Sequence, residues 1–242
     1  MGVILSRGRV AVRWAEGAED LARSRALRHL CFVTRGGARQ EADGLDALHR
    51  HLLVEAAGRA LATCRLRVTP PGPDRARGAA GRAYDLGALA DHPGAAMEIG
   101  RFCVHPDAGG PDALRLLWGA LARVVAEKDV TLMFGCASFP GAEVARHAPT
   151  LGWLGRERAL DALVTAQAGG VALAGLPPGA AMAARAGLPP LLRSYLAMGG
   201  RVGRDAVTDA AMNTVHVFCA VPVADVPGPR ARALAALAQE GP

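Results

Sequence analysis

Aromatic residues are scarce in this chain of 242 amino acids, making up 4% of it although 51% of the residues are hydrophobic. A core of this composition must be aliphatic, built mainly from Ala, Leu and Val. Without interleaved aromatic side chains the chain offers no platform on which nucleotide bases could stack, and its arginines form no stripe. A non-enzymatic basic module that binds RNA is therefore the weaker interpretation, and we expect no nucleic-acid partner.

Cysteine is sparse and irregularly placed. The five cysteines lie in apolar runs without a CxxC spacing, and this odd number predicts neither a disulfide framework nor a zinc site. The first ten residues contain no apolar stretch long enough for a signal peptide, so we expect a cytoplasmic protein.

Charge is absent from Ala162 to Ala184. A membrane-spanning helix needs about 20 strongly apolar residues, whereas this run is rich in Gly and Ala and is interrupted by Pro177–Pro178. We expect a loop and a weak helix that pack on the domain. Peripheral contact with a membrane surface stays open as an alternative.

Lysine is almost missing. Of 28 basic residues only Lys128 is a lysine, and with 22 acidic residues the net charge is +6. The preference for arginine partly reflects genomic base composition, and most arginines are expected on the solvated surface. The excess nevertheless favours an acidic partner, because net charge acts on association rather than on the fold.

Periodicity predicts a mixed α/β chain. An alternating run at 8–14 indicates a first strand, and apolar residues on one helical face predict a helix over 19–32. Residues 69–81 (TPPGPDRARGAAG) show no core-forming pattern and are expected to form a loop. The remaining strands are expected at 51–55, 60–68, 97–104, 130–136 and 213–223, and the remaining helices at 111–127 and 229–239. This order fits one domain spanning 1–242 that is built on a single sheet.

The densest group of polar residues in an apolar context is MEIGRFCVHP, residues 97–106. Charged side chains in so apolar a strand are costly unless they are paired or functional. Glu98 and Arg101 are three residues apart, so a regular strand would point them to opposite faces. Gly100 between them predicts a bulge that brings both to one side. The alternatives are a structural ion pair and a functional site.

This motif resembles the ornithine N-acyltransferases, which are sequence relatives of the acyl-homoserine-lactone synthases. The match includes E-x-x-R followed by F-C-V-x-P, and then MFGCASFPG at 133–141. Leu27-Arg28 with Phe32 matches L-R-x-x-x-F. Further matches are DGLD (43–46) with HLLV (51–54), TCRL (63–66), LPPLLRSYLAMGGRVG (188–203) and MNT (212–214), so that the resemblance covers roughly residues 10–223.

The resemblance implies a GNAT-like fold, with a core at 8–160 and a C-terminal helix and strand at 185–225 that complete the mixed central sheet. It implies transfer of a (3-hydroxy)acyl group to the α-amine of L-ornithine, the first step of ornithine lipid synthesis. The usual R/Q-x-x-G-x-G/A phosphate loop is replaced by Asp107-Ala-Gly-Gly-Pro111. The expected donor and partner is therefore an acylated acyl carrier protein rather than a CoA nucleotide, and no other cofactor or metal is expected.

The resemblance also assigns site residues. Glu98 is the candidate base, because partly desolvated carboxylates serve in general base catalysis. Backbone N–H groups near Arg101–Cys103 are expected to hold the oxyanion. Arg101 is assigned to the catalytic set with Glu98, and the expected substrate-binding residues are Arg28, Asp43, Asp46, Arg65, Phe102, Cys103 and Val104. The arginines would bind a carboxylate or the 3-hydroxyacyl group and the aspartates an ammonium, although turn and cap chemistry is an equal alternative for the aspartates.

The nearest alternative is an acyl-homoserine-lactone synthase that uses S-adenosylmethionine and shares these residues. The FGCASFPG segment and the long C-terminal part favour the ornithine family. Cys136 is not expected to be a nucleophile, because no histidine or acid accompanies it in a recognisable pattern.

Overall fold

The described part of the chain, residues 2–39, 41–160 and 164–239 of a computed structural model, contains one nine-stranded sheet in the order β1-β2-β3-β4-β5-β6-β9-β8-β7. All neighbouring strands are antiparallel except β5 and β6, which are parallel. The strands are β1 Val3–Arg7, β2 Val10–Trp14, β3 Arg50–Ala56, β4 Arg59–Thr69, β5 Ala95–Val104, β6 Val130–Pro140, β7 Val171–Ala172, β8 Arg201–Asp209 and β9 Thr214–Pro222.

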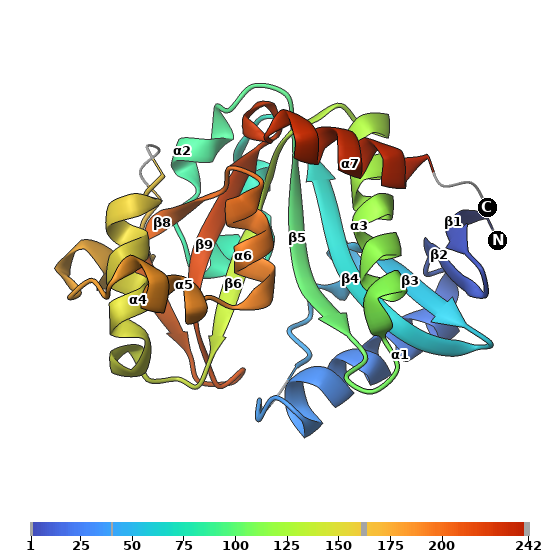
Figure 1. Ribbon diagram of the computed structural model, residues 1–242, viewed down its shortest axis with the longest axis horizontal. Helices are drawn as coiled ribbons and strands as arrows, with labels where there is room; N and C mark the ends of the chain where they lie inside the picture. The colour runs from blue at the N-terminus through green and yellow to red at the C-terminus, as the bar shows by residue number, and fades with distance from the viewer. Residues whose placement is uncertain (1, 40, 161–163, 240–242) are drawn as a thin grey trace.

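Helices flank this sheet on both faces (Figure 1). The α-helices are α1 Gly17–Arg28, α2 Gly87–Ala90, α3 Gly110–Glu127, α4 Val144–Glu157, α5 Ala181–Ala186, α6 Pro190–Ala197 and α7 Gly228–Ala238. A π-helical turn, His29–Thr34, continues α1, and 3-10 turns lie at Asp46–Leu48, Pro73–Arg77, Ala80–Arg82, Leu173–Gly175 and Val223–Asp225. None of the described helices is long and apolar enough to cross a membrane.

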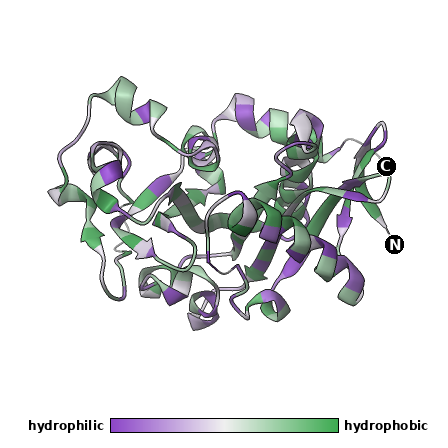
Figure 2. Ribbon diagram, turned by 90° about the horizontal axis from the view of Figure 1, so that it is seen from below, coloured by the Kyte–Doolittle hydropathy of each residue, from purple (hydrophilic) through white to green (hydrophobic). Residues whose placement is uncertain are grey.

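Side-chain alternation along the strands assigns the two faces of the sheet. Cys64 and Leu66 of β4 join the core cluster that contains Leu116, Leu117 and Leu121 of α3. Residues on the other face of β4 meet α1, since Ser24 bonds Thr63 at 2.8 Å. Successive strand residues point to opposite faces, so α3 and α1 cover opposite sides of the sheet. Figure 2 shows hydrophobic residues concentrated on the central strands.

Most predicted elements are confirmed, including the GNAT-like mixed sheet. The β3–β4 hairpin turns at Ala57 and Gly58, both with positive φ, as a two-residue turn requires. Helix α3 has Pro111 in its first turn and buries an aliphatic stripe. The C-terminal part completes the sheet because β9 pairs with both β6 and β8. Unpredicted elements include β1, which pairs with β2, and α4, which contains Pro149.

Two predictions need correction, and a third is confirmed in part. The helix expected over 19–32 is α-helical only to Arg28 and then widens into the π-helical turn. Residues 69–81 form a packed segment rather than a loop without core contacts. Arg75 is 1% exposed and its guanidinium donates to the carbonyls of Leu89, His92 and Gly94. In the charge-free run the expected weak helix is present as α5, whereas the two-residue strand β7 was not predicted, and positions 162 and 163 lie outside the described residues.

Candidate active site

A cavity of about 1030 Å³ opens where β5 and β6 separate. The two strands pair from Ala95 only as far as Ile99, opposite Gly135. Beyond that point β5 contributes Gly100–Val104 to one wall, and β6 contributes Cys136, Ser138 and Pro140 to the other. The divergence of the two strands is visible in Figure 1. The cavity therefore lies beside the motif that the sequence singled out.

A β-bulge lies at Arg101 and Phe102. Thr63 of β4 pairs with Cys103 and Arg65 pairs with Gly100, so two residues of β5 oppose one residue of β4. Arg101 has φ 51°, a conformation that turns its side chain away from regular alternation. The predicted bulge is confirmed, although the residue with positive φ is Arg101 and not Gly100. As a result the Arg101 side chain reaches Asp43 and donates a hydrogen bond to it. Arg65, which lies on the same face of the sheet as Glu98, donates to the same carboxylate.

Glu98 is buried in the cavity wall, with 3% of its surface exposed. Its Oε1 accepts a hydrogen bond from the backbone N–H of Ala80 at 2.7 Å. Its Oε2 has no hydrogen-bond partner among the described residues and faces the His49 ring. The chain passes so close at Gly78 that a Cβ there would lie 2.5 Å from the Glu98 Cδ. The segment expected to be an ordinary loop therefore encloses the candidate base.

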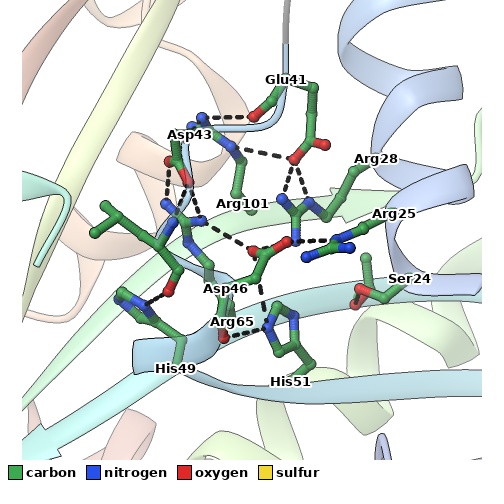
Figure 3. Close-up of polar contacts among 12 residues, drawn as sticks. Ser24, Arg25, Arg28, Glu41, Asp43, Asp46, His49, His51, Arg65 and Arg101 are labelled. Carbon is green, nitrogen blue, oxygen red and sulfur yellow. Dashed lines mark hydrogen bonds and ion pairs between the residues drawn. The ribbon is translucent and has the colours of Figure 1, made fainter. Parts of the chain in front are cut away.

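Seven charged side chains form a cluster (Figure 3), and three of them, Asp43, Arg65 and Arg101, line the same cavity as Glu98. Arg65 donates to Asp43 at 2.5 Å and to Asp46 at 3.1 Å. Arg101 donates to Asp43 at 3.0 Å and to the Glu41 carbonyl at 3.0 Å. The whole cluster comprises four guanidinium groups and three carboxylates, so one positive charge remains in excess: Arg25, Arg28, Arg65, Arg101, Glu41, Asp43 and Asp46.

The electrostatics of the cluster keep Asp43 and Asp46 as anions. Burial opposes the charged form of Asp43, but the hydrogen bonds and charge of Arg65 outweigh it and hold the pKa of Asp43 well below its usual range. Burial also raises the pKa of Asp46, but the hydrogen bonds from Arg28 and Arg25 outweigh it and hold that pKa well below its usual range. For Arg101, burial and the nearby charge of Arg65 lower the pKa of the guanidinium. An added anion would therefore be most favourable beside Arg101.

The predicted residues separate into two groups. Arg28 and Asp46 are outside the cavity lining and pair with each other at 2.8 Å. Both oxygens of Asp43 also accept from arginines, so for both aspartates the geometry favours anchoring of guanidinium groups. A role in binding an ammonium stays a prediction. The second group consists of the predicted residues that line the cavity: Asp43, Arg65, Glu98, Arg101, Phe102, Cys103 and Val104.

Four residues escaped the sequence analysis. Arg25, expected to be a simple surface residue, donates to Asp46 at 2.7 Å. Glu41 pairs with Arg28 and Arg101. Arg82 lines the cavity and donates to the Asp43 carbonyl at 2.7 Å, and His49 meets Glu98. The signal that could have found them is the density of charged residues at 41–46, directly before an apolar strand. Burying such charges is costly unless they are paired.

The far part of the cavity is apolar and aromatic. The rings of Phe102 and Trp118 have centroids 5.4 Å apart, and Trp118 meets Tyr195 edge-on at 5.9 Å. Leu114 and Leu191 also line this part. Together these aromatic and aliphatic side chains form an apolar surface that suits an acyl chain.

Other chemistry finds little support at the site. Burial raises the pKa of the Cys136 thiol, which makes it a poor nucleophile. Among the described residues no group of three or more His, Cys, Asp or Glu side chains is arranged to hold a metal ion. The arrangement supplies a carboxylate, a cationic cluster, an irregular strand and an apolar chamber.

The chain is similar in sequence to known acyltransferases. Residues 27–119 match the acetyltransferase (GNAT) domain. The chain is 33% identical over 226 residues to an L-ornithine N(alpha)-acyltransferase from Rhodobacter capsulatus, covering 86% of this chain and 87% of that protein. It is 30% identical to one from Rhizobium meliloti, covering 91% and 83%. The structure of FeeM, an N-acyl amino acid synthase from uncultured soil microbes, is similar in fold, with a TM-score of 0.54, 11% identity and coverage of 96% and 97%.

Proposed function

Because this chain belongs to the L-ornithine N(alpha)-acyltransferase family, we propose that it transfers an acyl group, plain or 3-hydroxylated, from acyl carrier protein to the α-amine of L-ornithine. In this reaction the neutral amine attacks the thioester carbonyl and the C–S bond breaks. An amide forms, and the thiol of the carrier leaves with a proton. The observation that carries the proposal is the buried Glu98 carboxylate in the wall of the cavity, where β5 and β6 separate.

Glu98 is the base in this proposal. Its Oε2 is the only buried carboxylate oxygen among the described residues without a hydrogen-bond partner. In this role the Glu98 carboxylate takes a proton from the ornithine α-ammonium, directly or through a water. The carboxylates of Asp43 and Asp46 are held by arginines, whose hydrogen bonds and charge lower the pKa of both groups.

The arginine cluster receives the carboxylate of ornithine. Its member Arg101 lines the cavity, and Arg82 adds a further guanidinium at the cavity wall. The Nε of Arg65 is buried without an acceptor among the described residues and lies beside Gly100. A carboxylate at this position would satisfy a spare donor and neutralise the cluster.

The bulge supplies the oxyanion site. The shift in register leaves the backbone of Arg101 and Phe102 outside the regular ladder between β4 and β5. Backbone N–H groups freed in this way point donors at one place without side-chain reorganisation. A thioester laid along β5 would put its carbonyl there and its acyl chain against Phe102, Trp118 and Leu191.

The carrier protein would dock at the mouth of the cavity. Exposed Arg35 and Arg39 flank Gly36, which lines it. Arg35 pairs with Asp107 at 2.9 Å on the segment that precedes α3, where the nucleotide-binding glycine pattern is missing. Surface arginines attract an acidic carrier protein by long-range charge. A peripheral contact with the membrane belongs to the same proposal, supported by Met182, which is 86% exposed in the charge-free run.

Mass spectrometry of purified reactions tests the function. Acyl carrier protein loaded with plain or 3-hydroxyacyl chains is offered ornithine, its Nδ-acetyl derivative, its Nα-acetyl derivative or S-adenosylmethionine in separate reactions. We expect acylated ornithine, acceptance of the Nδ-blocked derivative and no product from the Nα-blocked one. Acyl-homoserine lactone from S-adenosylmethionine, without acyl-ornithine, would instead identify the synthase alternative. Binding to RNA without acyl transfer in any reaction would favour a binding module.

A further inference from the structure

His49 lies directly beneath the cavity but does not line it. It follows the 3-10 turn Asp46–Leu48 at the start of β3, and its side chain is 1% exposed. The ring Nδ1 is 2.8 Å from the Leu45 carbonyl oxygen, and the ring Nε2 is 3.5 Å from Oε2 of Glu98. Both ring nitrogens thus face oxygen acceptors in a place that water does not reach.

This arrangement has a consequence for protons. The Leu45 carbonyl can only accept, so Nδ1 must carry a hydrogen. The Nε2 atom and the Glu98 Oε2 atom then face each other, and two lone pairs at that distance would repel. One proton between them, bound to either atom, removes the repulsion. The separation of 3.5 Å is at the outer limit of a hydrogen bond, and such contacts often shorten when substrate binds.

Glu98 depends on this contact for its orientation. Its Oε1 is held by the Ala80 N–H and its Oε2 is enclosed by Gly78 and the His49 ring. No other described side chain donates to Oε2. The same short turn also presents Asp46 to Arg28 and Arg65, so one segment orders the charge cluster and the histidine together.

We propose that His49 is a positioning residue for Glu98, holding its carboxylate through a proton shared between Nε2 and Oε2. The inference rests on the proposed function, in which Glu98 is the base. Charged and titratable groups on the elements around the pair are Asp43, Asp46, Arg65, Arg67, Asp74, Arg101, Cys136 and His216.

Two substitutions separate positioning from packing. His49→Asn places its amide near the position of Nδ1, so it keeps a donor for the Leu45 carbonyl and loses the contact with Oε2 of Glu98. His49→Gln reaches towards the position of Nε2 and keeps a donor for Glu98. We expect His49→Asn to lower kcat about 10- to 100-fold, since small misplacements of a reacting group are that costly, with the KM for ornithine changed less than threefold. His49→Gln should recover most of kcat, and the exposed control His29→Gln should match the wild type.

The dependence on Glu98 is measured by a double-mutant cycle and by pH. His49→Asn should add no further loss in a Glu98→Gln background, because the residue acts through Glu98. The acidic limb of the kcat/KM profile should move to higher pH in His49→Asn only, since the shared proton no longer favours the ionised carboxylate. Equal fold losses in both backgrounds, equal activity of the Asn and Gln variants, or an unmoved acidic limb would each overturn the proposal.

A readout without substrate separates this inference from the function. Ring ¹⁵N resonances of His49, assigned by their loss in His49→Gln, should change in Glu98→Gln at the Nε2 position. An unchanged Nε2 signal would overturn the coupling even if ornithine is acylated. If the signal changes but the enzyme acylates an acceptor other than ornithine, the proposed acceptor is wrong and the contact between His49 and Glu98 is supported.

Discussion

Replacement of Gly78 by alanine perturbs Glu98 without touching its chemistry. The added methyl group would overlap Oε2 of Glu98 and lie 2.5 Å from its Cδ and 2.8 Å from its Oε1. Carbon atoms pack at about 3.5–4.0 Å, so the carboxylate or the chain at Gly78 must move by about 1 Å or more. The φ of Gly78 is −82°, so the effect is steric and not a matter of glycine's conformational freedom.

The side chain of Glu98 gives way more easily than the backbone, so activity should suffer more than stability. Overpacking of this kind costs about 1–3 kcal/mol, which lowers the melting temperature by about 2–4 °C per kcal/mol in a chain of this size. A 1 Å displacement of the base should reduce kcat/KM for ornithine about 100-fold.

The matched control is Gly175→Ala, where an added methyl group meets nothing within 4 Å. Melting temperature and steady-state kinetics are measured on both variants. We expect the control to behave as the wild type. Wild-type turnover in a folded Gly78→Ala variant would refute the placement of the carboxylate, and a proportionate loss of stability and activity would make the effect one of folding alone.

Three further predictions concern charge. Arg101→Lys should raise the KM for ornithine at least about 10-fold, because lysine lacks the planar fork of the guanidinium. The melting temperature should change by only a few degrees, since Asp43 keeps its hydrogen bonds from Arg65. A stable, fully active variant would exclude the forked contact. Raising salt across the physiological range should raise the KM for acyl carrier protein, because exposed charge attraction is screened; salt-insensitive activity with acyl-CoA at low micromolar concentration would oppose a carrier donor. The contribution of His51 and His216 to the melting temperature should be constant above pH 6.5 and decrease below it, because burial lowers the pKa of both groups beneath 6.5 and the unfolded chain then binds protons first. A second fall is expected below pH 3.8, where the lowered pKa of Asp43 and Asp46 no longer favours the folded state; a curve without either fall would contradict the burial of these groups.

The sequence predicts the centre of the site well. An apolar strand with two charged residues and a glycine between them indicates a bulge, and the structure has one. The candidate base and the arginine beside the bulge could therefore be named without coordinates. Alternation and helical periodicity also predict the strands that carry them, because these patterns are local.

What encloses the site could not be predicted. The contacts of Gly78 and Ala80 with Glu98 join residues about twenty positions apart through an irregular segment whose composition is that of a loop. The pairing of Arg101 with Glu41 spans sixty positions, and nothing in its spacing distinguishes it from surface charge. His49 sits in a polar stretch where a histidine is ordinarily exposed, and only the 3-10 turn before it directs the ring inward.

The central claim is that Glu98 removes the proton from the α-amine of ornithine. Turnover of Glu98→Gln with acyl carrier protein and ornithine, measured beside its melting temperature, tests this most directly. We predict a folded variant whose kcat falls about 10²–10⁴-fold, as expected for loss of a general base, with ornithine binding little changed. A folded Glu98→Gln variant with near-wild-type turnover would contradict the account.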